Sequence, residues 1–346
     1  MSALPATLLS ALFISITIGA LISWVPLPYA VMSPGPATNV LGTVDGRPLV
    51  EVKGATTYPT SGSLDFTTVS VAGGPDYRVN VYNVLVAWLR SSEEVLPEEQ
   101  VFPANATQED VEAEGAAEMA SSQQIAAATA LRAIGQEVKE HLVIAGIPAG
   151  SPAEGVFKAG DVLVSVDGVE AVDATAVRAA VQKHKPGERV VVIVKRDDKQ
   201  ITLEATTGES DGRTVLGVSL GIGYDLPIEV TVHAGNVGGP SAGLMFSLAI
   251  YDVLTPGSLV GGKNIAGTGT MEQGGVVGAI GGIRQKVVGA HDAGAEWFLT
   301  PTANCEELIG HVPDGMTAVR VGNFQEARNA VQAIGVGQTS SLTTCG

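Results

Sequence analysis

Two short stretches in the C-terminal half decide how this chain is interpreted: Gly238-Gly239-Pro240-Ser241-Ala242-Gly243 and Gly281-Gly282-Ile283-Arg284-Gln285-Lys286. The first places a serine on a tight glycine-rich turn, and the second ends in a lysine that precedes the largely apolar run Val287–Ala290. A serine hydroxyl is a poor nucleophile until a neighbouring base takes its proton. A lysine among apolar groups can act as that base, because desolvation lowers its pKa. The two stretches therefore predict a Ser241–Lys286 catalytic pair.

The residues around the serine predict a strand, a turn and a helix in that order. Val230–His233 has the pattern of a strand, and Ala242–Leu254 has that of a buried helix. Such a turn exposes the serine hydroxyl and directs free helix N-terminal amides at the same point. We expect backbone amides at Gly239 and Ser241 to form an oxyanion hole. Substrate is expected to lie as a strand along Val232 and His233.

The stretch His233–Glu306 resembles the peptidase domain of the Lon family. The resemblance is carried by Gly239-Pro240-Ser241-Ala242-Gly243, Ala266-Gly267-Thr268-Gly269, Gly278-Ala279-Ile280-Gly281-Gly282 and Lys286. It implies that Ser241 is the nucleophile, Lys286 the general base and Thr268 the threonine that orients the lysine. ATP-dependent Lon has an acidic residue three positions before the serine, where this chain has Gly238. The chain is more similar to the membrane-anchored, ATP-independent branch of the family that carries a PDZ domain.

This resemblance gives a domain plan within an α+β fold. Gly62–Val69 and Met119–Gln124 resemble the hairpin-rich beginning and the first helix of the Lon-type domain. We therefore expect a split proteolytic domain with a PDZ domain inserted into it. The predicted parts are a transmembrane anchor (1–30), an N-terminal peptidase part (31–136) with an acidic loop (91–118), a PDZ domain (137–206), a catalytic C-terminal part (207–337) and a tail (338–346).

The PDZ prediction rests on several short motifs. Gly160–Gly168 reads as a strand that ends in an Asp-Gly turn, and it is followed by a helical stretch, Ala174–Lys183, and a closing strand, Arg189–Lys195. A PDZ domain binds an extended peptide as an added strand between an edge strand and a helix. The carboxylate-binding loop is expected near Val143–Ile147, which departs from the usual Gly-Leu-Gly-Phe pattern. The alternative is a small β-domain with a structural role only.

The N-terminus predicts a transmembrane helix. No charged side chain precedes Asp45, and Ala6–Val25 is mostly apolar. About 20 helical residues span the hydrocarbon core of a bilayer. A cleaved signal peptide is the alternative, but it would normally carry a basic segment first. The family resemblance implies a single-pass cell-membrane protein with its catalytic part outside the cytoplasm.

Composition excludes several other functions. The net charge of −16 opposes nucleic-acid binding. Gly257–Asn264 has the glycine and lysine spacing of a phosphate-binding loop but ends in asparagine instead of serine or threonine, so no nucleotide site is expected. No cofactor or metal site is expected either. Cys305 and Cys345 lack metal-ligand spacing, and whether they pair is left open. The acidic stretch 91–118, with nine acidic and no basic residues, reads as a solvated loop or as a lid.

The function expected from these features is that of an ATP-independent serine endopeptidase, anchored in the membrane. It would cleave extracytoplasmic protein or peptide substrates recruited through the PDZ groove. The Lon resemblance also implies a homo-oligomeric ring, a hexamer, whose active sites face an inner chamber. The alternatives are a catalytically inactive PDZ-bearing membrane scaffold, and a Ser–Lys enzyme that cuts only itself or a single partner.

Overall fold

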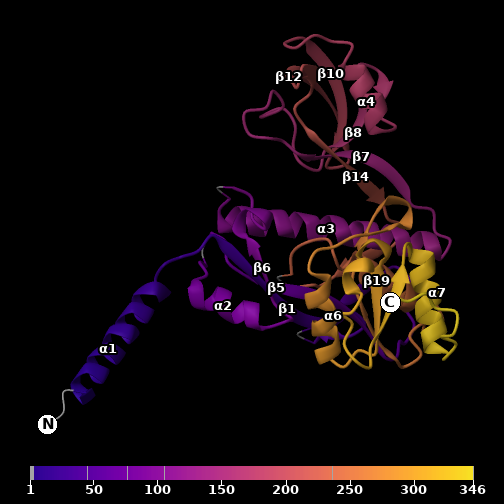
Figure 1. The fold of residues 1–346 in the computed structure, drawn as a ribbon. Helices are drawn as coiled ribbons and strands as arrows, with labels where there is room; N and C mark the ends of the chain where they lie inside the picture. The colour runs from indigo at the N-terminus through magenta and orange to yellow at the C-terminus, as the bar shows by residue number, and fades with distance from the viewer. Residues whose placement is uncertain (1–3, 45, 76, 105, 236, 346) are drawn as a thin grey trace. The chain divides into compact units, whose positions relative to one another are not determined.

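The computed structural model describes residues 4–44, 46–75, 77–104, 106–235 and 237–345, without the side chains of residues 4–9 and 11. The chain forms two compact units. The larger unit combines Met1–Gly135 with Ile228–Gly346, and the smaller unit is Gln136–Pro227. The larger unit is thus assembled from two separated parts of the chain, with the smaller unit inserted between them (Figure 1).

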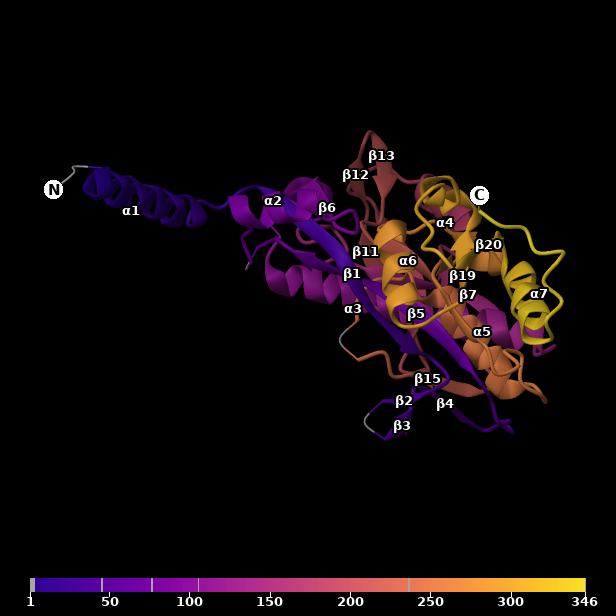
Figure 2. The ribbon, with the colours of Figure 1, turned by 60° about the horizontal axis from the view of Figure 1, so that its bottom comes forward.

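A six-stranded mixed sheet forms the centre of the larger unit. Its order is β20 (Thr317–Val321), β19 (Trp297–Pro301), β16 (Asn264–Gly267), β5 (Ser63–Ala72), β1 (Tyr29–Asn39) and β6 (Glu94–Pro97). The first four strands run parallel to one another, and β1 is antiparallel to both β5 and β6. Figure 2 shows β1 and β5 as two long neighbouring strands. The expected mixture of helices and strands is therefore present.

Helices α5 (Gly243–Leu254) and α6 (Ile283–Asp292) cover opposite faces of this sheet. Successive side chains of a strand point to opposite faces. On β5, Phe66 packs against Phe246 of α5 with ring centroids 5.5 Å apart, while Val69 lies against the backbone at Gly282, where α6 begins. A third helix, α7 (Phe324–Gly335), packs beside α5. The two helices that the sequence linked to catalysis therefore begin on either side of one strand.

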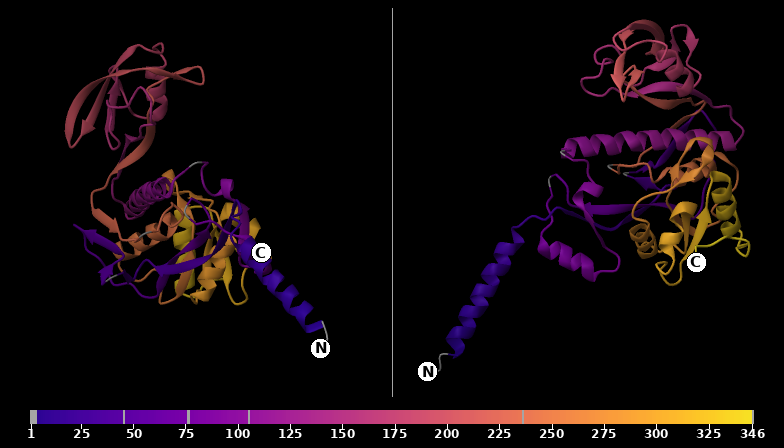
Figure 3. Two further views of the ribbon diagram at one scale, coloured as in Figure 1. Left: turned by 90° about the vertical axis from the view of Figure 1, so that its left-hand side faces the viewer. Right: turned by 45° about the horizontal axis from the view of Figure 1, so that its top comes forward.

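The acidic stretch is helical over its second half. Helix α3 runs from Gln108 to Ala133 as one uninterrupted helix (Figure 3), although the sequence predicted a helix only from Met119. Thr107 caps the helix in a reciprocal capping box with Asp110. Acidic side chains in the first turn also favour the helix N-terminus. The Thr-x-x-Asp spacing was the signal for this start.

The transmembrane prediction for Ala6–Val25 is wrong. Helix α1 (Leu4–Ser23) ends two residues before the predicted span does. Its described part contains hydroxyl side chains, two of which bond to the helix backbone: Thr17 Oγ1 donates to the carbonyl of Phe13 and Ser23 Oγ to that of Ala20. Among the described residues, no helix is both long and apolar enough to cross a bilayer. The extracytoplasmic location therefore stays a prediction from the resemblance alone.

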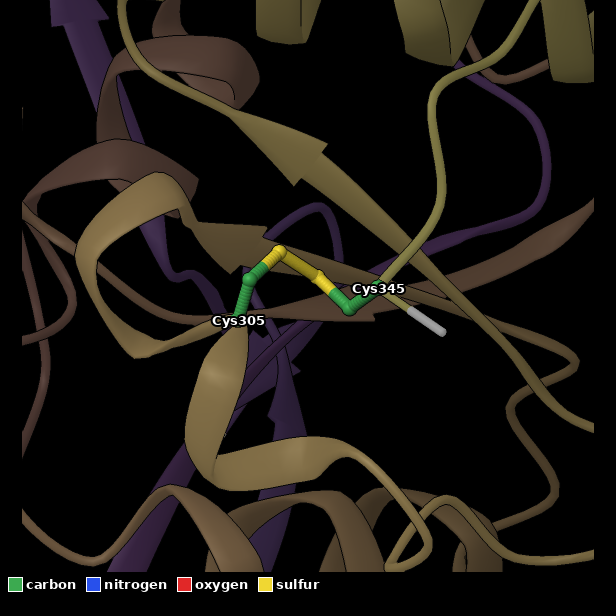
Figure 4. Close-up of a disulfide and its surroundings, with 2 residues drawn as sticks. All are labelled: Cys305 and Cys345. Atoms are coloured by element: carbon green, nitrogen blue, oxygen red, sulfur yellow. A yellow bond between two sulfur atoms is a disulfide. The ribbon is translucent and has the colours of Figure 1, made fainter.

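The remaining elements of the larger unit are short. They are β2 (Thr43–Val44), β3 (Arg47–Pro48), β4 (Val50–Lys53), α2 (Val81–Leu89), η1 (Glu98–Gln100), β15 (Glu229–Val232), β17 (Thr270–Met271), η2 (Gln273–Gly275), β18 (Val277–Gly278), η3 (Thr302–Asn304) and η4 (Glu306–Leu308). Cys305 and Cys345, whose pairing the sequence left open, form a disulfide. Figure 4 shows this bond between the turn that carries Cys305 and the C-terminal segment.

The smaller unit is an antiparallel sheet with one covering helix. The strand order is β11 (Lys199–Thr206), β10 (Arg189–Arg196), β8 (Val162–Val166), β7 (Lys139–Gly146) and β14 (Ser219–Asp225). Strand β9 (Val169–Glu170) pairs with β8, a hairpin joins β12 (Gly208–Ser210) and β13 (Arg213–Val215), and the helix is α4 (Ala174–Val181). Asp167 and Gly168 both have positive φ, as the predicted turn requires. This unit continues past residue 206 to the end of β14.

Candidate active site

Ser241 lies on the turn that leads into α5. Its carbonyl oxygen accepts hydrogen bonds from the amide of Gly269 at 2.8 Å and from the Thr268 hydroxyl at 3.0 Å. The preceding carbonyl, that of Pro240, accepts a hydrogen bond from the buried Ser122 hydroxyl of α3 at 2.9 Å. These bonds fix the turn from two sides, so the position of the serine side chain is set by the backbone around it.

The position of Lys286 is set by the close packing of α6 against the sheet. The helix starts after Gly282, which has a left-handed φ of 68° and no room for a Cβ, since that atom would lie 2.6 Å from Val69 Cγ1. One turn after Lys286, a Cβ on Gly289 would lie 2.5 Å from the Gly35 carbonyl oxygen of β1. Both close approaches need glycine. They bring the first turn of α6 onto the sheet and direct Lys286 toward the turn that carries Ser241.

The three predicted catalytic side chains meet in one place. Nζ of Lys286 is 2.8 Å from Oγ of Ser241 and 3.3 Å from the hydroxyl oxygen of Thr268. Thr268 follows directly after β16, so it lies at the carboxyl end of a central parallel strand. Its hydroxyl donates to the Ser241 carbonyl and leaves its oxygen to accept from the lysine. Thr268 thus connects the backbone at the serine with the amine of the lysine.

Burial changes the acidity of the lysine. The side chain of Lys286 is only 3% exposed, and Thr268 is fully buried. Desolvation lowers the pKa of Lys286 from 10.5 to about 8, because the charged form loses its hydration. A lysine with a pKa near 8 is partly neutral at physiological pH and has a lone pair that can accept the serine proton.

In the structure, the two backbone amides predicted to form the oxyanion hole differ in whether their N–H group already donates a hydrogen bond. The N–H of Gly239 donates to the carbonyl of Gly115 in α3 at 3.0 Å, so it is occupied. No described residue accepts a hydrogen bond from the N–H of Ser241 or of Ala242, which stands at the N-terminus of α5. The available oxyanion donors are therefore Ser241, as the sequence suggested, and Ala242 in place of Gly239.

A cavity of about 260 Å³ opens beside the serine. It is lined by residues from β5, α3, the loop before the serine and the catalytic pair: Phe66, Thr67, Thr68, Val69, Met119, Val237, Gly238, Ser241, Ala242 and Lys286. The sequence analysis did not identify Met119 or Val237 as site residues. Val237 belongs to no motif, and Met119 was noted only as the start of the stretch that resembles the first helix of the Lon-type domain. Both reach the site through the packing of α3 against the loop.

Val232 and His233, predicted as substrate contacts, do not line this cavity. Strand β15 pairs with β4, and the ring Nε2 of His233 lies 3.1 Å from Glu51 Oε2. The same contact with His233 holds the pKa of Glu51 below its usual value. No group of three His, Cys, Asp or Glu side chains in the described part of the chain is arranged to hold a metal ion.

The smaller unit has a groove of its own. The groove has a volume of about 490 Å³ and lies between α4 and residues 210–220. Strand β14 pairs only with β7 and so forms an edge of the sheet. The predicted loop, Val143–Ile147, belongs largely to β7 inside the sheet and does not line the groove. The loop that does is Leu216-Gly217-Val218, directly before the edge strand.

Comparisons with known proteins agree with this division of the chain. Residues 220–331 match the model of the Lon protease C-terminal proteolytic domain, and residues 129–207 match the PDZ domain model. The Lon protease of Buchnera aphidicola is 34% identical over 106 residues, which are 30% of this chain and 13% of that protein. Lon protease 1 of Herpetosiphon aurantiacus is 38% identical over 109 residues, 32% of this chain and 13% of that protein.

Among solved structures, the PDZ domain of an SdrC-like protein from Listeria monocytogenes covers 23% of this chain and 86% of that chain, with 21% identity and a TM-score of 0.22. The matched segments span only 13% of the length of the two Lon proteases. The larger unit therefore contains a proteolytic domain of the Lon type, which confirms the predicted class of a serine protease domain. The chain also carries a PDZ domain.

Proposed function

We propose that this chain is an ATP-independent serine endopeptidase in which Ser241 is the nucleophile and Lys286 the general base. The observation that carries the proposal is the 2.8 Å distance between Lys286 Nζ and Ser241 Oγ, with the amine buried. An inactive scaffold would have no chemical need for a desolvated lysine beside a serine. The sequence offers no complete phosphate-binding loop, so hydrolysis by this chain needs no nucleotide.

In the first half-reaction, Oγ of Ser241 forms a bond to the scissile carbonyl carbon while its proton passes to neutral Lys286. The carbonyl oxygen becomes an oxyanion that the amides of Ser241 and Ala242 stabilise. The C–N bond then breaks, and the ammonium of Lys286 returns the proton to the departing amine. In the second half-reaction, water attacks the ester carbonyl while Lys286 takes a proton from it. The bond between the carbonyl carbon and Oγ then breaks, the ammonium of Lys286 returns the proton to Oγ of Ser241, and the acid product leaves.

The PDZ unit is proposed to bind an extended peptide as a strand added to β14. Three features support this role: β14 is an edge strand, α4 lies across the groove, and the loop Leu216-Gly217-Val218 precedes the strand. Apolar side chains of α4, among them Val177 and Val181, line the groove and would hold apolar side chains of the peptide. The peptide would be a segment of the protein to be cut.

The test is cleavage of a permanently unfolded, fluorescently labelled protein by the full chain without nucleotide. We expect the parent to cleave it and Ser241→Ala to be inactive, because no other group can form the acyl ester. Ser70→Ala is the matched control, since Ser70 is an exposed serine of the same unit. A parent that neither cleaves the protein nor is labelled by a small serine-acylating reagent would refute the proposal.

A further inference from the structure

A second and larger groove runs along α3 next to the catalytic cavity. It has a volume of about 720 Å³. One wall is a single face of α3 between Gln108 and Gln123, and the other is formed by Gly235, Val237 and Gly238 of the loop before the serine. The residues on the helix wall recur every three or four positions, which is the spacing of one helical face. The groove therefore follows the helix axis.

The groove and the catalytic cavity are direct neighbours. Met119, Val237 and Gly238 line both of them. Met119 is buried, so its side chain is held in place between the two spaces. For a polypeptide whose scissile bond lies at Ser241, the groove is therefore the neighbouring space on the far side of Met119.

The loop before the serine touches α3 at Gly115. A Cβ on Gly115 would lie 3.4 Å from Gly238 Cα, and the amide of Gly239 donates to the Gly115 carbonyl. The helix and the loop are thus in direct backbone contact. Val111 and Glu112 of the helix wall precede this contact, and the wall after it carries Met119 and the small side chains of Ala116 and Ala120. Small side chains at these positions leave space for an extended chain.

The charge of the groove is set by Glu112. It is the one charged side chain among the described residues that line the groove. One of its carboxylate oxygens accepts a hydrogen bond from Gln108 Nε2 at 2.9 Å, which orients the group. Glu112 precedes Met119 by seven residues, which corresponds to about 10 Å along the helix axis. An extended chain covers that distance in about three residues.

We infer that this groove binds the substrate polypeptide on one side of the scissile bond and that Glu112 selects a lysine or arginine about three residues beyond the cavity. The inference rests on the proposed function, because it assigns flanking subsites to the same reaction. The inference predicts that the preferred substrates are flexible segments with a basic residue near the scissile bond. The helix wall, whose part before Met119 the sequence suggested was a loop or lid, would then be a specificity determinant.

The first test fills the groove. Ala116→Trp is expected to lower kcat/KM for a long unfolded polypeptide by about tenfold, because the indole occupies the path of the chain. Ala117→Trp is the matched control, since Ala117 is the next residue on α3, is exposed and does not line the groove. A small serine-acylating reagent, which needs only the catalytic cavity, reports whether the Ser–Lys pair of each variant is intact. Equal kcat/KM values for the two tryptophan variants would overturn the inference.

The second test measures whether the carboxylate of Glu112 selects a basic residue of the substrate. Fluorogenic peptides carry one lysine at successive positions on either side of the scissile bond, and a second series carries glutamine instead. We expect the lysine peptide to be cut about fivefold faster at one position, and Glu112→Gln to remove that difference. Glu114→Gln is the matched control, because Glu114 is an exposed acid of the same helix outside the groove lining. A parent that cuts all peptides without regard to lysine position would overturn the inference while leaving the proposed catalysis intact.

Discussion

Replacing Lys286 by methionine is expected to abolish peptide hydrolysis and, at neutral pH, to make the fold more stable. Methionine has a similar length but cannot accept the proton of Ser241. A positioned general base contributes about 10²–10⁴-fold to the rate. Because the two side chains act as one unit, Ser241→Ala in the same chain should add little further loss. The measurement is kcat/KM for a fluorogenic peptide.

The stability gain follows from the pKa of Lys286. The folded-state pKa is about 8 and the unfolded value is 10.5, so between these pH values only the unfolded chain holds the proton. The free energy of unfolding therefore rises with pH from about 8 to 10.5, and below pH 8 the buried charge costs the fold about 2–4 kcal/mol. Lys286→Met removes that cost.

Urea unfolding at pH 7 measures the gain. We expect Lys286→Met to unfold at a higher urea concentration than the parent, and the difference to shrink as the pH approaches 10.5. Lys263→Met is the matched control, because Lys263 is exposed. A methionine variant that is less stable than the parent at pH 7 would show that the buried charge at this position does not destabilise the folded state.

Loss of the Cys305–Cys345 disulfide is expected to lower the free energy of unfolding by about 4 kcal/mol. The bond joins residues 40 positions apart, and the stabilisation from a closed loop grows with its length. In the folded chain, the amide of Cys345 donates to the Ala318 carbonyl, and that of Arg320 donates to the Thr343 carbonyl. The C-terminal segment thus lies along β20, and the disulfide adds a covalent attachment at its end.

Unfolding of the parent with and without reductant measures this contribution, and the double variant Cys305→Ser, Cys345→Ser provides the control. Reductant should destabilise the parent and leave the double variant unchanged. A parent that unfolds at the same urea concentration in both conditions would contradict the prediction. Peptide cleavage by the reduced parent should persist at low urea, because neither cysteine touches the catalytic pair.

The catalytic pair was predictable from sequence because each of its two residues lies in a short motif whose local structure follows from the residues around it. Ser241 needs a turn before a helix, and Lys286 needs a helix start followed by apolar residues. Thr268 was identified only through the family resemblance, and the structure places it between the two. The pairing of β15 with β4 was not predictable, because the partner strand lies far away in the sequence. For the same reason His233 was expected at the substrate and is instead beside Glu51.

Other differences between the predictions from sequence and the structure also have local causes. Gly239 was expected to donate to the oxyanion, but the close approach of Gly115 occupies its amide. In the PDZ unit, the carboxylate-binding loop was expected near Val143–Ile147, which belongs largely to β7, although the edge strand is β14. The N-terminal segment was predicted to span a membrane from its apolar composition and lack of charge, although hydroxyl residues interrupt it; in the structure α1 ends at Ser23. The ring oligomer implied by the Lon resemblance stays a prediction.

The central claim is that neutral Lys286 is the base for Ser241, and the pH dependence of serine acylation tests it most directly. The rate of labelling by a small uncharged acylating reagent is measured from pH 6 to 10 on the full chain. The account predicts a rate that rises about tenfold per pH unit below pH 8 and levels off above it, with an apparent pKa of about 8. A rate that is flat over this range, or a pH dependence that disappears in His233→Gln, would contradict the account and assign the base elsewhere.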